Sequence, residues 1–255
     1  MIKKIKNTVV VPVAFIAFIS GSATQTIHAG VLDNLVDAAN SALPQYGREA
    51  SARANRTDLT SAEISAAIRE ALKLAAENVA LRFRAEGYND SSSRIELPPA
   101  WKKAQKIASR VGYGSDFDKL EQQLNKAALS AAPATRTLIK RLVDRLEFDN
   151  PRAILGGHDV AATEHLRQRI NSRLAERLKP IINDFLVEGG ATDASNKIAR
   201  RVVQLPMVKN LQTDLADHVV AQSLDGFFHH MEKEEQAIRV HPESRTSALL
   251  QRVFG

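Results

Sequence analysis

Residues 220–238 read VAQSLDGFFHHMEKEEQAI, and the spacing of their apolar side chains decides the fold. The apolar line recurs every three or four positions, which is the period of one face of an α-helix. Its members are Val220, Leu224, Phe227, Met231 and Ile238. Residues 214–240 are therefore predicted to form a helix that buries this line in a helical core.

The same helical period continues upstream in several segments. Thr60 to Glu63 has the sequence of a capping box, in which two side chains three positions apart each bond the other's backbone N–H group. The apolar line that follows consists of Ile64, Ile68, Ala71, Leu72, Ala75, Val79 and Phe83. Similar lines lie within residues 117–131, 138–146 and 166–185, and the alternation over residues 94–97 favours a brief extended piece. The sequence therefore predicts an all-α fold, a single multi-helix domain of about eight to ten helices.

Prolines and one aspartate set the expected helix boundaries. Pro133 is expected to end one helix, and Pro180 to kink or split the longest helix, which should start near Asp159. Asp159 follows Gly156-Gly157, where the free backbone N–H groups of a helix N-terminus offer a place for an anion. Because an aspartate at this position caps such groups itself, we expect Asp159 to take that role.

The first 29 residues have the layout of a cleaved secretory signal peptide. Three lysines precede an uncharged, mostly apolar run over residues 8–21, and a small-residue stretch ends at Ala29. The run is shorter than the roughly 20 residues that a membrane-spanning helix needs. We therefore expect a periplasmic protein whose mature form starts at or near Gly30 and does not span the membrane.

This layout divides the chain into a signal peptide (1–29), a short helix with a polar linker (30–58) and a helical domain (59–255).

Composition limits what the domain does. The 255 residues include no cysteine, which excludes thiol catalysis, thiolate metal sites and a lipid anchor on cysteine. The formal charge of +6 falls to +3 without the three signal lysines. An extracytoplasmic location then removes most of the support for nucleic-acid binding.

Several strings of the helical domain resemble one known family. They are Arg94-Ile95-Glu96-Leu97-Pro98, Gly156-Gly157 followed by Ala161-Ala162-Thr163, and Leu224-Asp225-Gly226-Phe227-Phe228, then Glu234-Glu235, Ile238-Arg239, Pro242, Arg245 and Val253-Phe254-Gly255. From about Leu59 to the last residue the chain is similar to the bacterial family called domain of unknown function 4197. The resemblance implies a secreted, mostly helical extracytoplasmic domain, and it carries no activity to transfer.

Glu234 and Glu235 are the sharpest candidates for a site. The apolar line has a gap in its last two turns, and one of the two glutamates falls into that gap. A buried carboxylate needs a cationic partner or several donors, and Arg239 lies one turn after Glu235. Asp225 and Arg245 complete a candidate cluster. We favour a structural ion pair in this cluster over a ligand-binding or catalytic carboxylate.

Arg169, Arg173 and Arg177 form a ladder with four-residue spacing beside the apolar line of their helix. The other basic residues that join it are Arg136, Lys140 and Arg141. Together they are a candidate basic rim around an apolar groove, which suits an amphiphile with an anionic head. An ordinary solvated face is the alternative, and nearby acidic residues favour it.

A metal site has weaker support. Asp225, His229 and Glu232 share one helix face at spacings that suit zinc. A solvated polar face explains the same spacing, because the neighbouring positions belong to the apolar line. We therefore expect no metal and no other cofactor.

These features favour an extracytoplasmic binding or interaction module of the bacterial cell envelope over an enzyme. The expected partner is a small molecule such as an anionic amphiphile, or another envelope protein, and no nucleic acid. One alternative is a hydrolase-like enzyme that uses the Glu234 and Glu235 carboxylates with Arg239, and another is a purely structural helper. A wide apolar pocket favours the first hypothesis, whereas carboxylates at a concave, solvent-reachable site favour the second.

Overall fold

The described part of the chain begins with the capping box and the helix that it starts. The structure is a computed structural model that describes residues 58–88, 90–202, 211 and 214–255. Thr60 Oγ1 accepts a hydrogen bond from the Glu63 backbone N–H at 3.2 Å. A Glu63 carboxylate oxygen accepts one from the Thr60 N–H at 2.9 Å. Both halves of the predicted capping box are present, and the helix α2 that follows spans Ser61–Glu86.

Within these residues the chain forms eight α-helices, one 3-10 helix and no β-strand. The helices are α2 (Ser61–Glu86), α3 (Pro99–Ser109), α4 (Gly114–Asp144), α5 (Pro151–Leu155), α6 (Ala161–Glu188), α7 (Ala191–Val202), α8 (Leu215–Val240), η1 (Pro242–Ser244) and α9 (Ala248–Phe254). They belong to one compact unit. The predicted all-α fold is confirmed.

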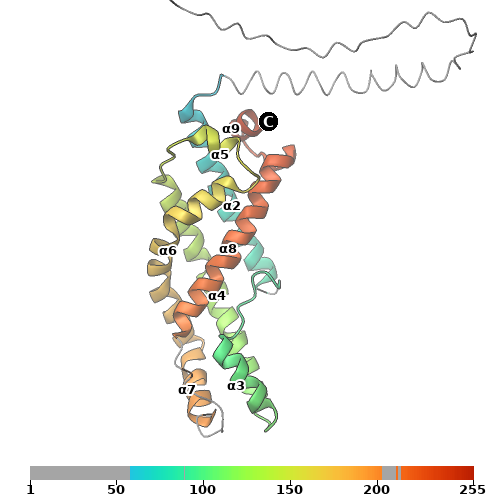
Figure 1. Ribbon diagram of the computed structural model, residues 1–255, viewed down its shortest axis with the longest axis vertical. Coiled ribbons are helices and arrows are strands. Elements are labelled where there is room, and N and C mark those ends of the chain that lie inside the picture. The colour runs from blue at the N-terminus through green and yellow to red at the C-terminus, as the bar shows by residue number, and fades with distance from the viewer. Residues whose placement is uncertain (1–57, 89, 203–210, 212–213) are drawn as a thin grey trace, which may run out of the picture. The chain divides into compact units, whose positions relative to one another are not determined.

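Four long helices, α2, α4, α6 and α8, form a bundle in which each packs against two neighbours (Figure 1). Both α2 and α6 lie against α4 and α8. Successive long helices run in opposite directions, as in an up-down-up-down bundle. Their apolar lines meet in one core, in which Phe83, Phe117, Phe227 and Phe228 are among the largest fully buried side chains. Figure 1 shows α3 and α7 at one end of the bundle, and α5 and α9 at the other.

Neither interior proline divides a helix. The predictions that a helix ends near Pro133 and that the helix starting near Asp159 is the longest are wrong. Helix α4 has 31 residues and continues through Pro133, and α6 has 28 residues and continues through Pro180. A proline removes one backbone hydrogen bond and costs about 3 kcal/mol in a helix interior. In both helices buried residues lie on either side of the proline, so burial along the whole helix offsets this cost.

Residues 94–97 run between helices without forming a strand. Ile95 and Leu97 are buried, whereas Arg94 and Glu96 are exposed, which is the alternation that the sequence predicts. The backbone of Ile95 bonds the Asn125 side chain of α4 twice, through its N–H at 2.9 Å and its carbonyl at 2.7 Å. Helix side chains therefore supply the partners that a neighbouring strand would supply in a sheet.

Helix α8 holds the next residue in the same way. The Glu96 N–H donates to Gln222 Oε1 at 2.8 Å, and the Glu96 carbonyl lies 2.7 Å from His218 Nε2. The segment is thus fixed to α4 on one side and to α8 on the other.

Gly226 of α8 allows the segment before Arg94 to approach the helix closely. A Cβ atom at this position would lie 3.0 Å from Ser93 Cα and 3.1 Å from Ser93 Cβ. Ser93 is buried, and its N–H donates to the Asp90 carbonyl at 3.0 Å. Because α4 holds the next two residues, through Glu121 to Arg94 and through Asn125 to Ile95, Ser93 has little room to move away.

The predicted signal peptide (1–29) lies outside the described residues, as does the predicted short helix with its linker (30–58) except for Asp58. In the part of the chain that the structure describes, no helix is both long and apolar enough to cross a membrane.

Replacement of Gly226 by alanine tests this close approach. In a helix with room for the added methyl group, a change from glycine to alanine raises the free energy of unfolding by about 0.5–1 kcal/mol. Here we expect Gly226→Ala to lower the free energy of unfolding by about 1–3 kcal/mol, because the added methyl group overpacks against Ser93. Urea unfolding measures the difference. Ala221→Gly, at an exposed position of the same helix, reports helix propensity alone. A stabilised Gly226→Ala protein would contradict the close packing.

Candidate functional site

Glu235 lies inside the molecule near the C-terminal end of α8, where it is 2 % exposed. One carboxylate oxygen accepts the Ala162 N–H at 3.0 Å, and the other accepts the Thr163 N–H at 2.7 Å. These two groups belong to the first turn of α6, whose N–H groups have no partner within the helix. A negative charge at this end is also favoured by the helix dipole. Glu235 therefore caps α6 from a distant part of the sequence.

Arg239 binds Glu235 and the end of a second helix. Its Nε donates to Glu235 Oε1 at 2.9 Å. Its two terminal nitrogens donate to the carbonyls of Leu155 and Ile154, at 2.8 and 3.0 Å. Both carbonyls lie in the last turn of α5, where a cation is favoured. The guanidinium also lies 5.6 Å from the centre of the Phe254 ring of α9, within the range of a cation–π contact.

Arg245 closes the end of α8 itself. Its Nε donates to the Ile238 carbonyl and its Nη2 to the Arg239 carbonyl, both at 2.9 Å. These carbonyls are in the last turn of α8 and need partners from outside the helix. One corner of the bundle thus contains a glutamate that caps α6 and two arginines that cap α5 and α8.

The prediction that Asp159 caps its own helix was wrong. Helix α6 starts after Val160, which is its N-cap residue. The side chain of Val160 makes no capping hydrogen bond to the helix. The Glu235 carboxylate occupies the N–H groups that the sequence assigned to Asp159 or to a bound anion. A capping partner that lies about 70 positions away cannot be found from the local sequence.

The other members of the candidate cluster lie elsewhere. Glu234 is half-buried and accepts a hydrogen bond from Asn78 Nδ2 of α2 at 2.7 Å. Asp225 is exposed and forms an ion pair with Arg167 of α6. The structure therefore brings Glu235, Arg239 and Arg245 together, and it places Glu234 and Asp225 outside their group.

This geometry leaves Glu235 little capacity for acid–base or nucleophilic chemistry. Each of its oxygens already accepts a backbone N–H group, and one also binds Arg239. A general base must lie within hydrogen-bond reach of its substrate. The 2 % exposure of Glu235 gives a substrate no approach. The contacts favour a structural role for the pair.

The three residues that suit zinc by spacing do not converge on one point. His229 Nδ1 lies 4.0 Å from Glu232, whereas Asp225 is paired with Arg167. Among the described residues, no group of three or more histidine, aspartate or glutamate side chains has the geometry to hold a metal ion.

His230 is a buried titratable group of the core rather than part of a site. It is 2 % exposed, and its ring meets the Phe83 ring edge-on at 5.3 Å. Burial, with smaller contributions from Lys233 and Arg82, holds the pKa of His230 below its usual value. Asp90 lies 3.6 Å away, beyond hydrogen-bond distance. The neutral imidazole is therefore the favoured form.

The arginine ladder of α6 does not form one continuous rim. Arg169 pairs with Asp149 at 2.8 Å, and with Arg173 it flanks a recess of about 170 Å³ between α4 and α6. Pockets that bind drug-sized molecules are typically about 300–1,000 Å³. Arg177 is exposed further along the helix. The recess is thus too small for the amphiphile that the sequence analysis considered.

The α4 members of the predicted rim divide between two places. Arg136 and Lys140 bind the same Glu77 carboxylate of α2, at 2.7 and 2.9 Å. Arg141 is exposed. The arginine ladder and these two cations therefore belong to different helix pairs.

A larger pocket of about 400 Å³ lies between α2 and α4, and sequence analysis missed most of it. Its apolar residues are Ala80, Leu81, Leu129, Ala132 and Pro133, and its two charged residues are Arg84 and Arg136. Leu81 is 53 % exposed. In the sequence, the one indication of this pocket is Leu81. It is an apolar residue outside the buried line of its helix, and it lies three positions before an arginine.

The two arginines of this pocket differ in what they bind. Arg136 donates to Glu77. Arg84 is exposed, and it has neither an ion-pair nor a hydrogen-bond partner among the residues that the structure describes. The pocket therefore combines an apolar floor with an available cation at its edge.

Substitution of the buried ion pair tests its structural role. Removal of one member leaves an uncompensated charge, so Glu235→Ala and Arg239→Ala should each lower the free energy of unfolding by about 3–5 kcal/mol. The double variant should lose much less than the sum. Glu234→Ala is the matched control and should lose about 0.5–1.5 kcal/mol with its hydrogen bond to Asn78. Thermal and urea unfolding measure all four, and near-parental stability of both single variants would refute the structural role.

Comparison with known proteins places the chain in a family without providing an activity. No curated protein and no solved structure shows significant similarity to it. One family model, described as "Protein of unknown function (DUF4197)", matches residues 58–255, which include every helix described above. The chain therefore belongs to the DUF4197 family of proteins of unknown function.

Proposed function

We propose that this protein is a binding module of the bacterial cell envelope, and that its ligand is a small amphiphile with an anionic head. The observation that carries the proposal is the pocket between α2 and α4. Its volume of about 400 Å³ lies within the range of small-molecule sites. An apolar chain would cover Leu81 and Leu129, and an anionic head would lie against Arg84.

Charge supports an anionic head over a cationic one. Both charged residues that line the pocket are arginines, and a guanidinium binds carboxylate or phosphate oxygens through two parallel N–H groups. Arg136 already binds Glu77 at 2.7 Å, which holds its guanidinium in place. Arg84 is therefore the residue proposed to bind the head, and Arg136 adds positive potential.

The alternatives have less support. A hydrolase-like enzyme needs a reachable carboxylate, whereas Glu235 is enclosed by the helix ends that it caps. The fully buried centre of a protein–protein interface is enriched in apolar and aromatic side chains. The large apolar residues exposed in the described part of the chain are Leu81 of α2, Val111 and Tyr113 in the turn between α3 and α4, Val187 of α6 and Val240 of α8.

Amphiphiles of equal chain length and different head charge test the ligand class. Dodecanoate should bind the purified protein, whereas a zwitterionic dodecyl phosphocholine and a cationic dodecyl ammonium should bind more weakly. Arg84→Gln should weaken dodecanoate binding about tenfold, as expected for the loss of a charged hydrogen bond. Leu81→Ser should weaken all three amphiphiles. Calorimetry measures each affinity.

The control for this experiment is Arg82→Gln, which removes an equal charge from a neighbouring exposed position that does not line the pocket. It should leave dodecanoate binding unchanged. Equal affinity for the three heads, or equal effects of Arg82→Gln and Arg84→Gln, would overturn the proposal.

The location is a separate part of the proposal and depends on residues 1–29. We expect the working protein to be exported and to begin at or near Gly30, because a charged start, an apolar run and a small-residue end are the three parts of a signal peptide. N-terminal sequencing of the protein from a periplasmic extract measures this. Recovery of an intact Met1 in the membrane fraction would disprove export by a cleaved signal.

A further inference from the structure

Positive charge is concentrated at the end of the bundle that lies opposite Glu235, where Figure 1 shows α3 and α7. Helix α3 and the turn after it, residues 99–113, contain four lysines and arginines and no acidic residue. Helix α7 contains three lysines and arginines and one aspartate. These two segments have a net charge of +6, whereas residues 30–255 together have +3. The rest of the chain after residue 29 is therefore net negative.

The cations of α3 occupy its exposed face. The buried face of this helix consists of Trp101, Ala104 and Ala108. Lys103, Lys106 and Arg110 follow the helical period on the opposite side, and all three are exposed. Lys102 pairs with Glu96, whereas the other three side chains have neither an ion-pair nor a hydrogen-bond partner among the residues described. Clustered charges of one sign repel each other, and an anionic partner would relieve that repulsion.

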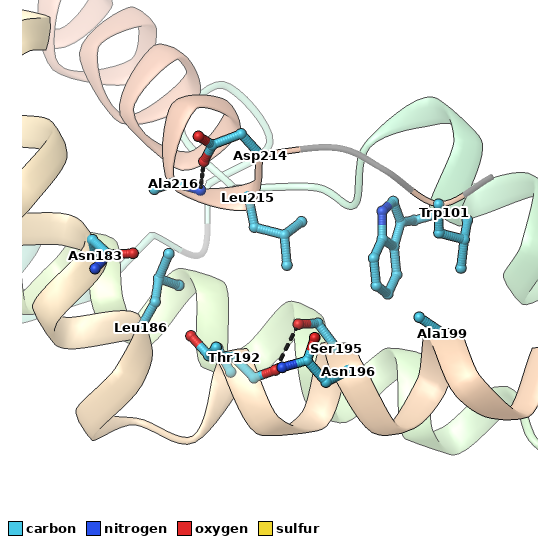
Figure 2. A pocket seen from close by; sticks show the side chains of 12 residues that line it. Trp101, Asn183, Leu186, Thr192, Ser195, Asn196, Ala199, Asp214, Leu215 and Ala216 are labelled. Atoms are coloured by element: carbon cyan, nitrogen blue, oxygen red, sulfur yellow. Dashed lines mark hydrogen bonds between the residues drawn. The ribbon is translucent and has the colours of Figure 1, made fainter.

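Helix α7 joins α3 and the turn after it in one surface. Arg201 forms an ion pair with Asp116 at the start of α4, and its guanidinium lies 4.9 Å from the centre of the Tyr113 ring. Figure 2 shows Trp101 of α3 and Ala199 of α7 in the lining of one pocket of about 230 Å³. We call α3, the turn after it and α7 the basic end.

The turn between α3 and α4 exposes apolar side chains among these cations. Gly112 has a φ of +86°, the left-handed conformation that lets the chain reverse after α3. Val111 and Tyr113 on either side of it are 53 % and 41 % exposed. Tyrosine is enriched where a protein meets the boundary between water and lipid. Lysine and arginine beside large apolar residues are typical of surfaces that lie in this boundary.

These two features together select the partner. Unpaired cations suit any polyanion, but exposed valine and tyrosine side chains gain free energy only where an apolar phase covers them. We propose that the basic end docks the protein on a membrane surface that contains anionic lipids. Lys103, Lys106 and Arg110 would lie against the head groups, and Val111 and Tyr113 would enter the boundary between head groups and acyl chains. The inference does not depend on the amphiphile site, which has different residues.

Sedimentation with vesicles tests the docking. The purified protein should sediment with phosphatidylcholine vesicles that contain about 30 % phosphatidylglycerol, and it should stay in solution with phosphatidylcholine alone. An increase from about 0.05 M to about 0.5 M sodium chloride should release most of the bound protein, because salt screens the attraction.

Two triple variants assign the contact to the basic end. Lys103→Gln, Lys106→Gln and Arg110→Gln in one protein should weaken binding to the anionic vesicles at least about tenfold. The control combines Arg141→Gln, Arg145→Gln and Lys233→Gln, which remove the same charge from exposed positions near the other end of the bundle. It should bind as the parent does. Both variants keep residues 1–57, so those residues cannot cause a difference between them.

A fluorescent label tests the entry of the turn into lipid. The chain contains no cysteine, so Val111→Cys provides a single attachment point for an environment-sensitive dye. Its emission should move to shorter wavelength when anionic vesicles are added. Val240→Cys, at a residue that is 60 % exposed at the other end of the bundle, is the control and should show no shift.

Three results would overturn the proposal. The first is the absence of binding to the anionic vesicles at low salt. The second is an equal loss of binding in the two triple variants, which would place the contact outside the basic end. The third is bound protein whose label at position 111 shows no shift. The choice of a membrane over an acidic protein or a nucleic acid would then have lost its support.

Discussion

The ion pair between Glu235 and Arg239 is the interaction on which one end of the bundle depends. Burial of a carboxylate and a guanidinium carries a desolvation cost of several kcal/mol per ion. Here each charge also satisfies backbone groups that would otherwise be buried without partners: two N–H groups of α6 and two carbonyls of α5. An apolar replacement of the pair would remove the charges and leave those four groups unpaired. The pair therefore fixes where α5 ends and where α6 begins.

A related arrangement holds the segment before α3. Asn125 and Gln222 bond the backbone of residues 95–96 from two helices, and Gly226 lets Ser93 lie directly on α8. Helix α8 is thus positioned along its length by polar contacts with non-helical backbone as well as by its apolar line. Packing of apolar lines alone tolerates sliding between helices, whereas backbone hydrogen bonds to side chains specify one register. These contacts favour one register of α8 relative to the segment before α3.

The sequence predicted those features that depend on neighbouring residues. The capping box at Thr60, the apolar lines and the inward gap near Glu234 and Glu235 all follow from spacing along one helix. Spacing could not decide which glutamate is buried, since both lie close to the gap, and it could not name the partners on α5 and α6. Asp159 was assigned the cap because the local pattern fits, yet a partner from α8 occupies the site. Helix α4 continues through Pro133 because buried residues on both sides of the proline outweigh its low helix propensity, and that burial depends on other helices.

Local spacing is also insufficient to predict the candidate sites. It does not show which polar groups find hydrogen-bond partners in the fold and which do not. The charged residues that the sequence singled out are mostly engaged: Glu235 with helix ends, Arg169 with Asp149, and Arg136 with Glu77. Arg84 and the Trp101 N–H are two of the groups that lack partners in the described structure, and the sequence could not identify them, because a residue shows its unused capacity only after every neighbour is placed. A polar group whose hydrogen bonds are all made within the protein stabilises the fold. A polar group without a partner beside a pocket is free to form a hydrogen bond with a ligand. The proposed amphiphile site rests on this distinction, because Arg84 lies beside the pocket between α2 and α4 without a partner among the described residues.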